Sequence, residues 1–365
     1  MPNRRNFFKT VASATAGMLA MGPGLVDAGV LFLQGTPAKR REVFIGKRRI
    51  KVIDVHGHFI APEELDVIKD TNLVGNIRNN LNGPLVLGPA RLRLLDEQGL
   101  DVQVLSHQGG WWYGVDRDLA RQIIKVQNEK LAAWCTAHPD RFVGLASVAL
   151  QHPDLAAEQL EEAVKKLGLR GVGIAGHAGG EVPSSPKFDP FWAKVQELGV
   201  LVFVHPGGAD NVLRDGALRG RGDLGNIIGN PLETTVFLTR LIFDGTLDRF
   251  PGLKICGAHA GGYLPSYIGR TDVACDVREN ANCANKKHPR EYFKQQILID
   301  SMVFSEEGLR HLVAEFGVSQ IVYGTDIPFN WPVTVDLILR APFLKDAEKE
   351  AILSGNLIKL LRIAS

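Results

Sequence analysis

The stretch from Ile50 to His58 reads IKVIDVHGH, and it decides the fold because a β-branched run ends directly in two histidines. The run itself has the composition of a buried strand. Residues two apart on a strand point to the same face, about 7 Å apart at the backbone, so the imidazoles of His56 and His58 can reach one ion. Gly57 between them leaves room for close approach. Alone the pair is a weak signal, since most His-x-His pairs are surface or core histidines.

Seven further β-branched runs follow, separated by amphipathic helical stretches, which is typical of βα units and a parallel sheet. The predicted strands are Ile50–Val55, Val102–Ser106, Phe142–Val148, Gly171–Ala175, Val200–Val204, Lys254–Ala258, Ile297–Asp300 and Ile321–Gly324. The clearest predicted helices are Arg117–His138, Leu155–Leu167, Phe188–Leu198, Pro231–Asp248 and Ser305–Phe316. Eight such units favour an α/β fold of the closed (β/α)8 TIM barrel type over an open doubly wound sheet. No Gly-x-Gly-x-x-Gly follows the first strand, so a dinucleotide-binding fold lacks its fingerprint.

The composition is that of a globular protein with a sizeable core: 365 residues, 45% hydrophobic and 22% charged. A net charge of +2 gives no electrostatic argument for nucleic acid as a partner. The basic runs Lys39–Arg41 and Lys47–Arg49 are interpreted as a solvated connector before the first strand. We expect no membrane span. The four cysteines lack Cys-x-x-Cys spacing, which argues against a cysteine zinc site and leaves disulfide pairing open.

The N-terminus has the features of an export signal rather than of a fold. Residues 3–9 read NRRNFFK and closely resemble the twin-arginine export signature, with Phe8 where leucine is usual. An Ala- and Gly-rich segment follows, and Val26-Asp27-Ala28 forms a small-residue cleavage site. We therefore expect a periplasmic or exported protein; a cytoplasmic protein with a disordered or amphipathic tail is the alternative. The expected organisation is a signal segment over 1–28, a linker over 29–49 and one barrel domain over 50–365.

Four predicted strands end in side chains of the kind that bind metals. They supply His56 and His58, His205, His259, and Asp326. In a barrel of this type the carboxyl ends of all strands meet at one rim. Any one of these residues is more often a hydrogen-bonding histidine or a turn cap than a ligand, but their shared register predicts a metal-dependent-hydrolase type of site. Three imidazoles and one carboxylate with an open position suit one Zn²⁺, and Mn²⁺ or Fe²⁺ would also be tolerated.

These residues also resemble a known family. The sequence is similar to the amidohydrolase superfamily, and within it to the branch of 2-amino-3-carboxymuconate-6-semialdehyde decarboxylase and its relatives. The resemblance runs from Val52 to Leu361 and includes DVHGHFIAPEE, PARLRLLDEQGLDVQVLS, RFVGLASV, FVHPGG, NPLETT, FPGLKICGAHAGGYLPSYIGR, YGTDIPF and SGNLIKLL. It implies a homodimer, metal ligands at His56, His58, His205 and Asp326, and an acid/base at His259.

The resemblance further implies that Arg91 and Arg270 bind the carboxylates of the substrate, the latter across the dimer interface. Arginine forks bind carboxylates bidentately, which suits an anionic substrate. A surface arginine is the simpler interpretation of each, and Arg240 and Arg278 are competing candidates. The long connections Phe59–Pro89 and Asp272–Tyr292 are expected to be lids or subunit contacts.

Two departures from the family pattern bear on function. The resembled decarboxylase has a tryptophan just after its fifth-strand His-Pro, where this chain has Gly207-Gly208, so the pocket wall differs and the particular substrate is open. His177 stands where binuclear amidohydrolases place a bridging carboxylated lysine. One metal is therefore expected rather than two, with His177 contacting the substrate or supporting the site.

The expected function is a non-oxidative decarboxylase of an unsaturated or aromatic carboxylic acid. His259 and Asp326 would handle protons, and the substrate would be a small carboxylate. The alternative on the same site is a hydrolase of a lactone, amide or C–C bond. A third possibility is an inactive barrel used for binding, and the intact set of metal-type residues argues against it.

Overall fold

The computed structural model describes residues 40–364 except Gly110 and Asp215. The signal segment predicted for residues 1–28 lies outside these residues. The described residues belong to one compact unit, Lys39–Ser365. Within them, no helix has the length and apolar character needed to span a bilayer.

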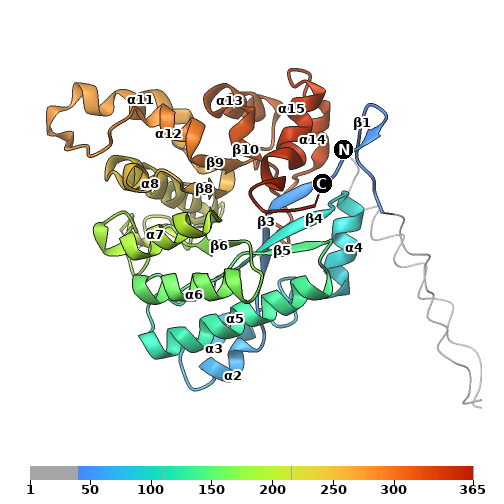
Figure 1. Ribbon diagram of the computed structural model, residues 1–365, viewed down its shortest axis with the longest axis vertical. Coiled ribbons are helices and arrows are strands. Elements are labelled where there is room, and N and C mark those ends of the chain that lie inside the picture. Colours follow the sequence, from blue (N-terminus) through green and yellow to red (C-terminus); the bar gives the residue numbers. More distant parts are fainter. Residues whose placement is uncertain (1–39, 110, 215, 365) are drawn as a thin grey trace, which may run out of the picture. The chain divides into compact units, whose positions relative to one another are not determined.

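Eight parallel strands form the barrel predicted from the sequence (Figure 1). They are β3 (Ile53–Phe59), β4 (Val102–His107), β5 (Phe142–Gly144), β6 (Gly171–Ile174), β7 (Leu201–Val204), β8 (Lys254–Gly257), β9 (Ile297–Asp300) and β10 (Ile321–Val322). They pair in chain order as β3-β4-β5 and as β6 through β10. Parallel bridges between Ala146 and Val172 and between Gly57 and Ile327 join the two sheets and close the barrel.

The barrel is surrounded by helices. The longer ones are α4 (Pro89–Gln98), α5 (Arg117–Ala137), α6 (Pro153–Lys165), α7 (Asp189–Leu198), α8 (Asn230–Phe243), α11 (Leu264–Val277) and α13 (Glu306–Phe316). Shorter ones are α9 (Thr246–Arg249), α12 (Pro289–Gln295), α14 (Val335–Arg340), α15 (Asp346–Glu350) and α16 (Asn356–Ile358). The prediction of a single helix over Pro231–Asp248 is wrong in one respect, because the structure has two helices there. Gly245 adopts a left-handed φ of 71°, which ends α8 before it and starts α9 after it.

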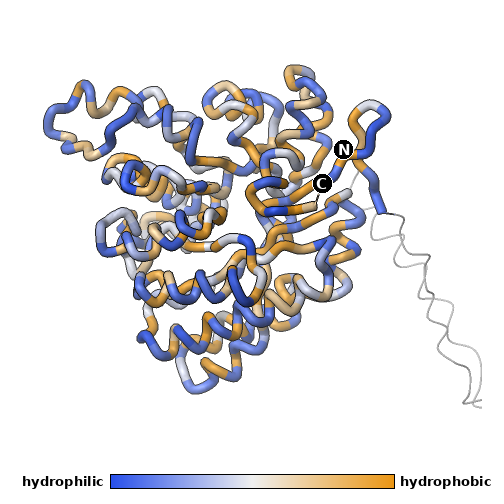
Figure 2. The backbone as a smooth tube through the Cα atoms, viewed as in Figure 1, coloured by the Kyte–Doolittle hydropathy of each residue, from blue (hydrophilic) through white to orange (hydrophobic). Residues whose placement is uncertain are grey.

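The core has an inner and an outer part. Inward-facing strand residues such as Val55, Val104 and Phe203 fill the barrel, and Leu357 and Leu361 near the C-terminus pack against them. The larger cluster lies between strands and helices. Figure 2 shows the strands as mainly hydrophobic, while the helices carry hydrophilic residues on their outer sides. The hydrophobic effect of burying both faces of each strand therefore holds the rim residues in place.

The residues before the barrel, interpreted as a solvated connector, are exposed at Lys47, Arg48 and Arg49, but their described part is structured. They form a hairpin of β1 (Phe44–Ile45) and β2 (Arg48–Arg49), which pair antiparallel. Val43 and Ile45 are buried in the core. Arg40 binds the carboxylate of Asp101 at 2.6 Å, Arg49 binds the same oxygen, and the other oxygen accepts from Val52 N at 2.8 Å. The arginines thus have partners, which the basic composition alone did not reveal.

The two long connections are both partly structured. Residues 59–89 contain α2 (Glu64–Ile68) and α3 (Val74–Arg78). Residues 272–292 contain a disulfide between Cys275 and Cys283, which resolves the pairing left open by the sequence. Cys135 and Cys256 are free thiols.

Candidate metal centre and active site

His56 and His58 lie on β3, and both are completely buried. Their Nε2 atoms are 3.0 Å apart, a distance at which two imidazole nitrogens share a proton or a cation. A Cβ at Gly57 would lie 2.4 Å from Cδ of Gln103, so the glycine makes room for the side chain of Gln103 rather than for the histidines.

Asp326 brings its carboxylate to the same point from the segment after β10. Its Oδ1 lies 3.0 Å from Nε2 of His58 and 3.2 Å from Nε2 of His56. Among the described residues this buried oxygen has no hydrogen-bond partner, although the nitrogens surround it. The ring of His205 completes the cluster, with its centroid 4.5 Å from that of His58 and 5.1 Å from that of His56.

His259 lies at the same cluster but faces the barrel mouth. His56, His205, His259 and Asp326 each offer one ligand atom, and these atoms lie within 4.8 Å of one another. Geometry therefore leaves two sets of four, one with His58 and one with His259. The side chain of His259 is 15% exposed and its Nε2 lies 3.7 Å from Oδ2 of Asp326, so it can reach both the cluster and an incoming molecule. Its assignment as proton carrier rather than ligand stays a prediction.

The electrostatics of the cluster fit a cation. Burial lowers the pKa of His58 to about 4 and that of His205 well below its usual value, so both rings are neutral and can donate a lone pair. For Asp326, burial opposes ionisation, but His56 and His259 hold the pKa of the carboxyl below its usual range. Burial likewise opposes a charge on His56, yet Asp326 and Asp300 raise its pKa to about 10. The two carboxylates favour a protonated, positively charged His56. A bound divalent cation would supply that positive charge instead.

Asp300 is a functional residue that the sequence analysis missed. Its Oδ2 is 2.7 Å from Nδ1 of His56 and accepts from the backbone N of His259 at 3.0 Å. Its Oδ1 accepts from the backbone N of Ala260 at 2.7 Å. His259 and Ala260 have left-handed φ values of 54° and 57°, which cost energy in non-glycine residues. Asp300 therefore orients one histidine and stabilises the strained turn of another.

Asp54 ties three strands together beneath the cluster. Its carboxylate accepts from Nε2 of Gln103 at 2.8 Å and from Oγ1 of Thr325 at 2.7 Å. It also accepts from the backbone N of His56 at 3.0 Å. Burial raises the pKa of Asp54 to about 6. These bonds fix the ends of β3 and β10, and hence the two segments that supply His56, His58 and Asp326.

Arg91, predicted to bind substrate, donates its hydrogen bonds to other protein groups in this structure. It lies on α4 and is only 3% exposed. Its guanidinium donates to Oε1 of Gln103 at 2.9 Å, to the carbonyl of His58 at 2.9 Å and to the carbonyl of Pro84 at 3.0 Å. These contacts favour a supporting role for Arg91 behind β3, and its contact with substrate stays a prediction.

Arg270 lies on the exposed side of α11. Of its competitors, Arg240 is paired with Asp244 at 2.7 Å and Arg278 is exposed just beyond α11. The contact of Arg270 with substrate across a dimer interface stays a prediction.

His177 follows β6 at the rim, with its Nε2 4.0 Å from Oε1 of Glu233. Glu233 is the second residue that the sequence analysis missed. This buried carboxylate on α8 accepts from the backbone N of Gly176 at 2.9 Å, Gly207 at 3.1 Å and Gly208 at 2.7 Å. It thus holds the rim segments after β6 and β7, including the twin glycines, in one arrangement.

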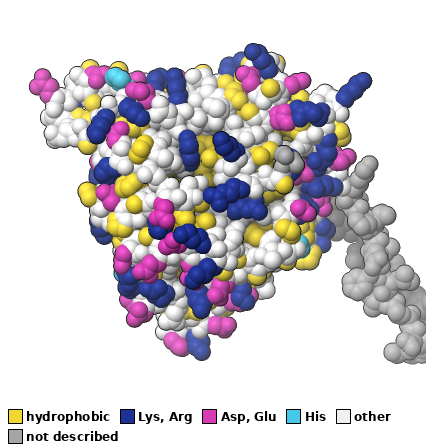
Figure 3. Space-filling model, viewed as in Figure 1, with side chains coloured by type: hydrophobic (Ala, Val, Ile, Leu, Met, Phe, Trp, Pro, Cys, Tyr) yellow, Lys and Arg dark blue, Asp and Glu magenta, His cyan; other side chains and the backbone are white. Residues whose placement is uncertain are grey.

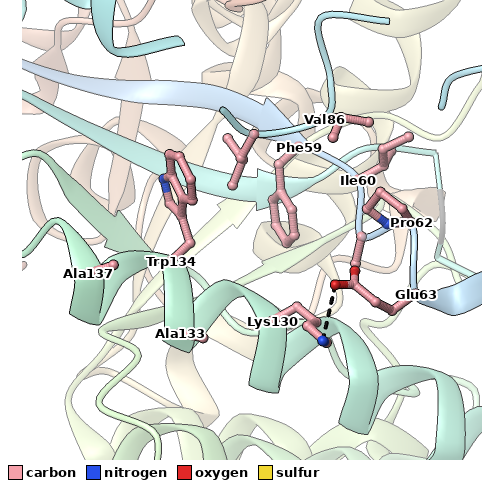
Figure 4. A pocket seen from close by; sticks show the side chains of 11 residues that line it. Phe59, Ile60, Pro62, Glu63, Val86, Lys130, Ala133, Trp134 and Ala137 are labelled. Carbon is pink, nitrogen blue, oxygen red and sulfur yellow. Dashed lines mark ion pairs between the residues drawn. The ribbon is translucent and has the colours of Figure 1, made fainter. Parts of the chain in front are cut away.

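Two pockets lie near β3, and they differ in their relation to the cluster. One of about 360 Å³ is lined by residues that include Ile60, Gln108 and Phe329, and the ring of Phe329 is 5.8 Å from that of His58. Another of about 440 Å³ lies between the end of β3 and α5, with an ion pair of Glu63 and Lys130 at its edge (Figure 4). Neither lining includes a histidine of the cluster, but Phe329 connects the first pocket to His58, so we take that pocket as the approach for a small molecule.

The family model of the amidohydrolases matches residues 53–363. The chain belongs to the amidohydrolase family, as its sequence motifs and its barrel both indicate.

Within this family, its curated relatives are decarboxylases. The chain is 32% identical over 281 residues to 2-amino-3-carboxymuconate-6-semialdehyde decarboxylase of Dictyostelium discoideum, covering 74% of this chain and 75% of that protein. It is 31% identical over 297 residues to gamma-resorcylate decarboxylase of Rhodococcus jostii, covering 76% and 88%. The decarboxylase branch predicted from the motifs is confirmed.

Solved structures give the same result. The chain superimposes on 5-carboxyvanillate decarboxylase of Sphingomonas paucimobilis with a TM-score of 0.78 and 26% identity, covering 86% of this chain and 100% of that one. For dihydroxybenzoic acid decarboxylase of Polaromonas, solved with bound manganese and the inhibitor 2-nitroresorcinol, the TM-score is 0.73 with 26% identity and coverage of 86% and 97%. A relative with this fold thus binds manganese.

Proposed function

We propose that this protein is a metal-dependent, non-oxidative decarboxylase of a planar unsaturated or aromatic carboxylic acid. The observation that carries the proposal is the convergence of the imidazoles of His56 and His58 on Oδ1 of Asp326, with the ring of His205 packed against both histidines. This oxygen is buried and has no hydrogen-bond partner among the described residues. Three imidazoles and one carboxylate would hold one divalent cation. Zn²⁺ suits this donor set best, with Mn²⁺ or Fe²⁺ as alternatives, and the manganese of the Polaromonas relative supports a cation at this position.

When bound, the cation supplies Lewis acidity that orients an anionic substrate and stabilises its developing negative charge. The protein's own residues perform the proton transfer. In the reaction, the bond between the ring or diene carbon and the carboxylate breaks, and its electron pair stays on that carbon. His259, held at the barrel mouth beside Asp326, donates a proton to the same carbon, and carbon dioxide leaves. Asp326, with Oδ2 at 3.7 Å from Nε2 of His259, orients the imidazole for the transfer.

The experiment is a metal analysis followed by an assay of carbon dioxide release. We expect about one divalent ion per chain and carbon dioxide from at least one hydroxylated benzoate or muconate-type acid. Protein that carries no such ion, and that stays inactive after Zn²⁺ or Mn²⁺ is added, contradicts the proposal. Incorporation of ¹⁸O from labelled water into product without carbon dioxide release would establish the hydrolase alternative instead.

We also propose that the protein is exported by the twin-arginine route and acts in the periplasm. The disulfide between Cys275 and Cys283 supports this, because such bonds persist in oxidising compartments and are rare in the cytosol. Replacing Arg4 and Arg5 together by lysine should leave the protein in the cytoplasm with both thiols reduced. Unchanged fractionation of that variant would support the cytoplasmic alternative.

Finally, we propose a homodimer in which α11 is part of the interface. Tyr267, Val273 and Val277 are large apolar residues exposed by 61%, 47% and 66%. Their spacing places them with Arg270 on one side of the helix. A contiguous exposed apolar surface of this kind marks an interaction site more often than free surface. Elsewhere, the face shown in Figure 3 has Lys and Arg side chains interspersed with Asp and Glu.

A further inference from the structure

Trp111, in the segment after β4, reaches into the barrel mouth. Its Cη2 lies 3.8 Å from the position that a Cβ would take at Gly173 on β6. Its Cδ1 lies 3.6 Å from the corresponding position at Gly207, two residues after His205. The indole therefore covers the ends of two neighbouring strands, in space that side chains at both glycines would otherwise enter.

The indole also lies beside the cluster of potential metal ligands described above. The Cβ position at Gly173 is 3.1 Å from Cβ of Ser106, and Oγ of Ser106 is 3.3 Å from Nδ1 of His58. Trp111 thus lies between Ser106, which contacts His58, and Gly207, which follows His205 by two residues. A molecule bound at the cluster would meet this ring.

The conformation of the backbone does not explain the glycine at 207, because its φ is not in the left-handed region. Space limits only how large a side chain could be at this position. A Cβ there would touch Ala175 at 3.5 Å and Trp111 at 3.6 Å, which is ordinary contact. A longer side chain would have to occupy the volume of the indole. The ring of Trp111 and a large side chain at 207 therefore exclude each other.

The position of Trp111 is fixed by the residues that follow it. Trp112 has a left-handed φ of 50°, and its indole donates to Oε2 of the buried Glu64 at 2.9 Å. Strain of this kind persists only where surrounding contacts compensate for it. Tyr113 stacks on Trp111 with ring centroids 6.2 Å apart and planes inclined by 29°, and its hydroxyl is 3.5 Å from the backbone N of Ala175.

We infer that Trp111 is the specificity-determining wall of the substrate pocket, and that it selects planar aromatic acids by stacking on their rings. The inference rests on the proposed function, because it concerns the substrate of that site. In this chain the segment after β4 supplies the pocket wall, because position 207 is a glycine and has no side chain that could do so. Stacking on the indole favours an aromatic ring over an open-chain conjugated diene, because the ring presents the larger flat π-face.

Kinetics with Trp111→Ala and Trp111→Phe give the first test, with 2,6-dihydroxybenzoate and a muconate-type acid as substrates of the metal-loaded protein. We expect Trp111→Ala to raise KM for the benzoate at least tenfold with a smaller change in kcat, and to shift selectivity toward the muconate. Trp111→Phe should keep most of the aromatic preference. Trp134→Phe, in the separate pocket of Figure 4, is the matched control and should leave KM unchanged. Unchanged KM and selectivity in Trp111→Ala would overturn the inference.

A swap of the two positions provides the second test. Gly207→Trp alone should impair benzoate binding, because its ring competes with Trp111. In the Trp111→Ala background the same substitution should restore aromatic selectivity at least partly. A double variant no better than Trp111→Ala, or a Gly207→Trp variant with normal KM, would contradict mutual exclusion. Circular dichroism confirms that each variant is folded.

A binding measurement separates this inference from the proposed function. Tryptophan fluorescence of metal-loaded His259→Asn, titrated with 2,6-dihydroxybenzoate, should be quenched, and the quench should disappear when Trp111→Phe is added. In one outcome the quenching depends on Trp111 while the unsubstituted protein releases carbon dioxide from no acid. That result would overturn the decarboxylase proposal but support Trp111 as a wall of the pocket. Carbon dioxide release with a quench independent of Trp111 would do the opposite.

Discussion

Asp300 is the residue on which two parts of the site depend, since it contacts Nδ1 of His56 and the backbone of the turn at His259. A carboxylate in this position fixes the tautomer and orientation of a metal-binding imidazole. Asp300→Asn should therefore lower metal affinity by roughly 10- to 100-fold, as measured by competition with a chromophoric chelator. Asp276→Asn, at an exposed carboxylate 3.9 Å from His288, is the control and should bind metal normally. Equal affinity of both variants would refute the role of Asp300.

Glu64 gives a prediction about acid stability. Burial opposes ionisation of this carboxyl, but His107, Gln127 and Trp112 together hold its pKa below the ordinary 4.5. A group with a lowered folded-state pKa contributes stability above its unfolded pKa and loses it as pH falls through the folded value. The free energy of unfolding should thus fall as pH drops below about 4.5, and less steeply in Glu64→Gln.

Denaturant titrations of the two proteins at matched pH values measure this difference. Since both retain the same metal-type histidines, the protonation of those residues is common to them. Parallel slopes below the ordinary carboxyl range would show that Glu64 is not the group responsible.

At the level of single residues, the sequence predicted the members of the cluster that end strands. His205, His259 and Asp326 each follow a β-branched run, so their common rim could be inferred. Asp300 ends such a run too, but its contact with His56 depends on how β3 and β9 tilt in the closed barrel. Glu233 had no such signal, because it lies in a helix and acts on backbone groups of distant loops.

Among the elements, all eight strands were predicted to within a few residues, because buried parallel strands are short apolar runs between turns. The hairpin β1–β2 was not, since its two-residue strands lack a recognisable period and its arginines suggested solvent. Their partners, Asp101 above all, are remote in sequence. Such pairing becomes visible only in the folded chain.

The hairpin yields a prediction about stability. Asp101 accepts charged hydrogen bonds from Arg40 and Arg49 and one from the backbone of Val52. Asp101→Ala leaves these donors without their acceptor, so it should lower the free energy of unfolding by about 2 kcal/mol. Asp70→Ala, at an exposed position, should change it by no more than about 0.5 kcal/mol. Urea titrations measure both, and similar values for the two variants would count against a structural role of the hairpin.

For the whole molecule, the decisive prediction concerns two chains. If Arg270 serves the site of the partner subunit, Arg270→Ala and His259→Asn should each be inactive alone. Mixed after dissociation and reassociation, they should regain activity, because one site in each mixed dimer has both residues. Sedimentation analysis would show the dimer independently. Two inactive variants that stay inactive when mixed, despite forming mixed dimers, would place Arg270 outside the site.

The closing seam of the barrel has a consequence for how the protein is made. The backbone N of Asp326 donates to the carbonyl of His56 at 2.8 Å, and the N of His58 donates to the carbonyl of Ile327 at 2.8 Å. The first and last strands therefore meet at the very residues that would hold the metal. During translation these residues are separated by almost the entire barrel, so no ribosome-bound fragment lacking β10 can present a complete set of donor atoms. The complete donor set forms only when the segment after β10 has joined β3, so full metal affinity reports that the barrel has closed.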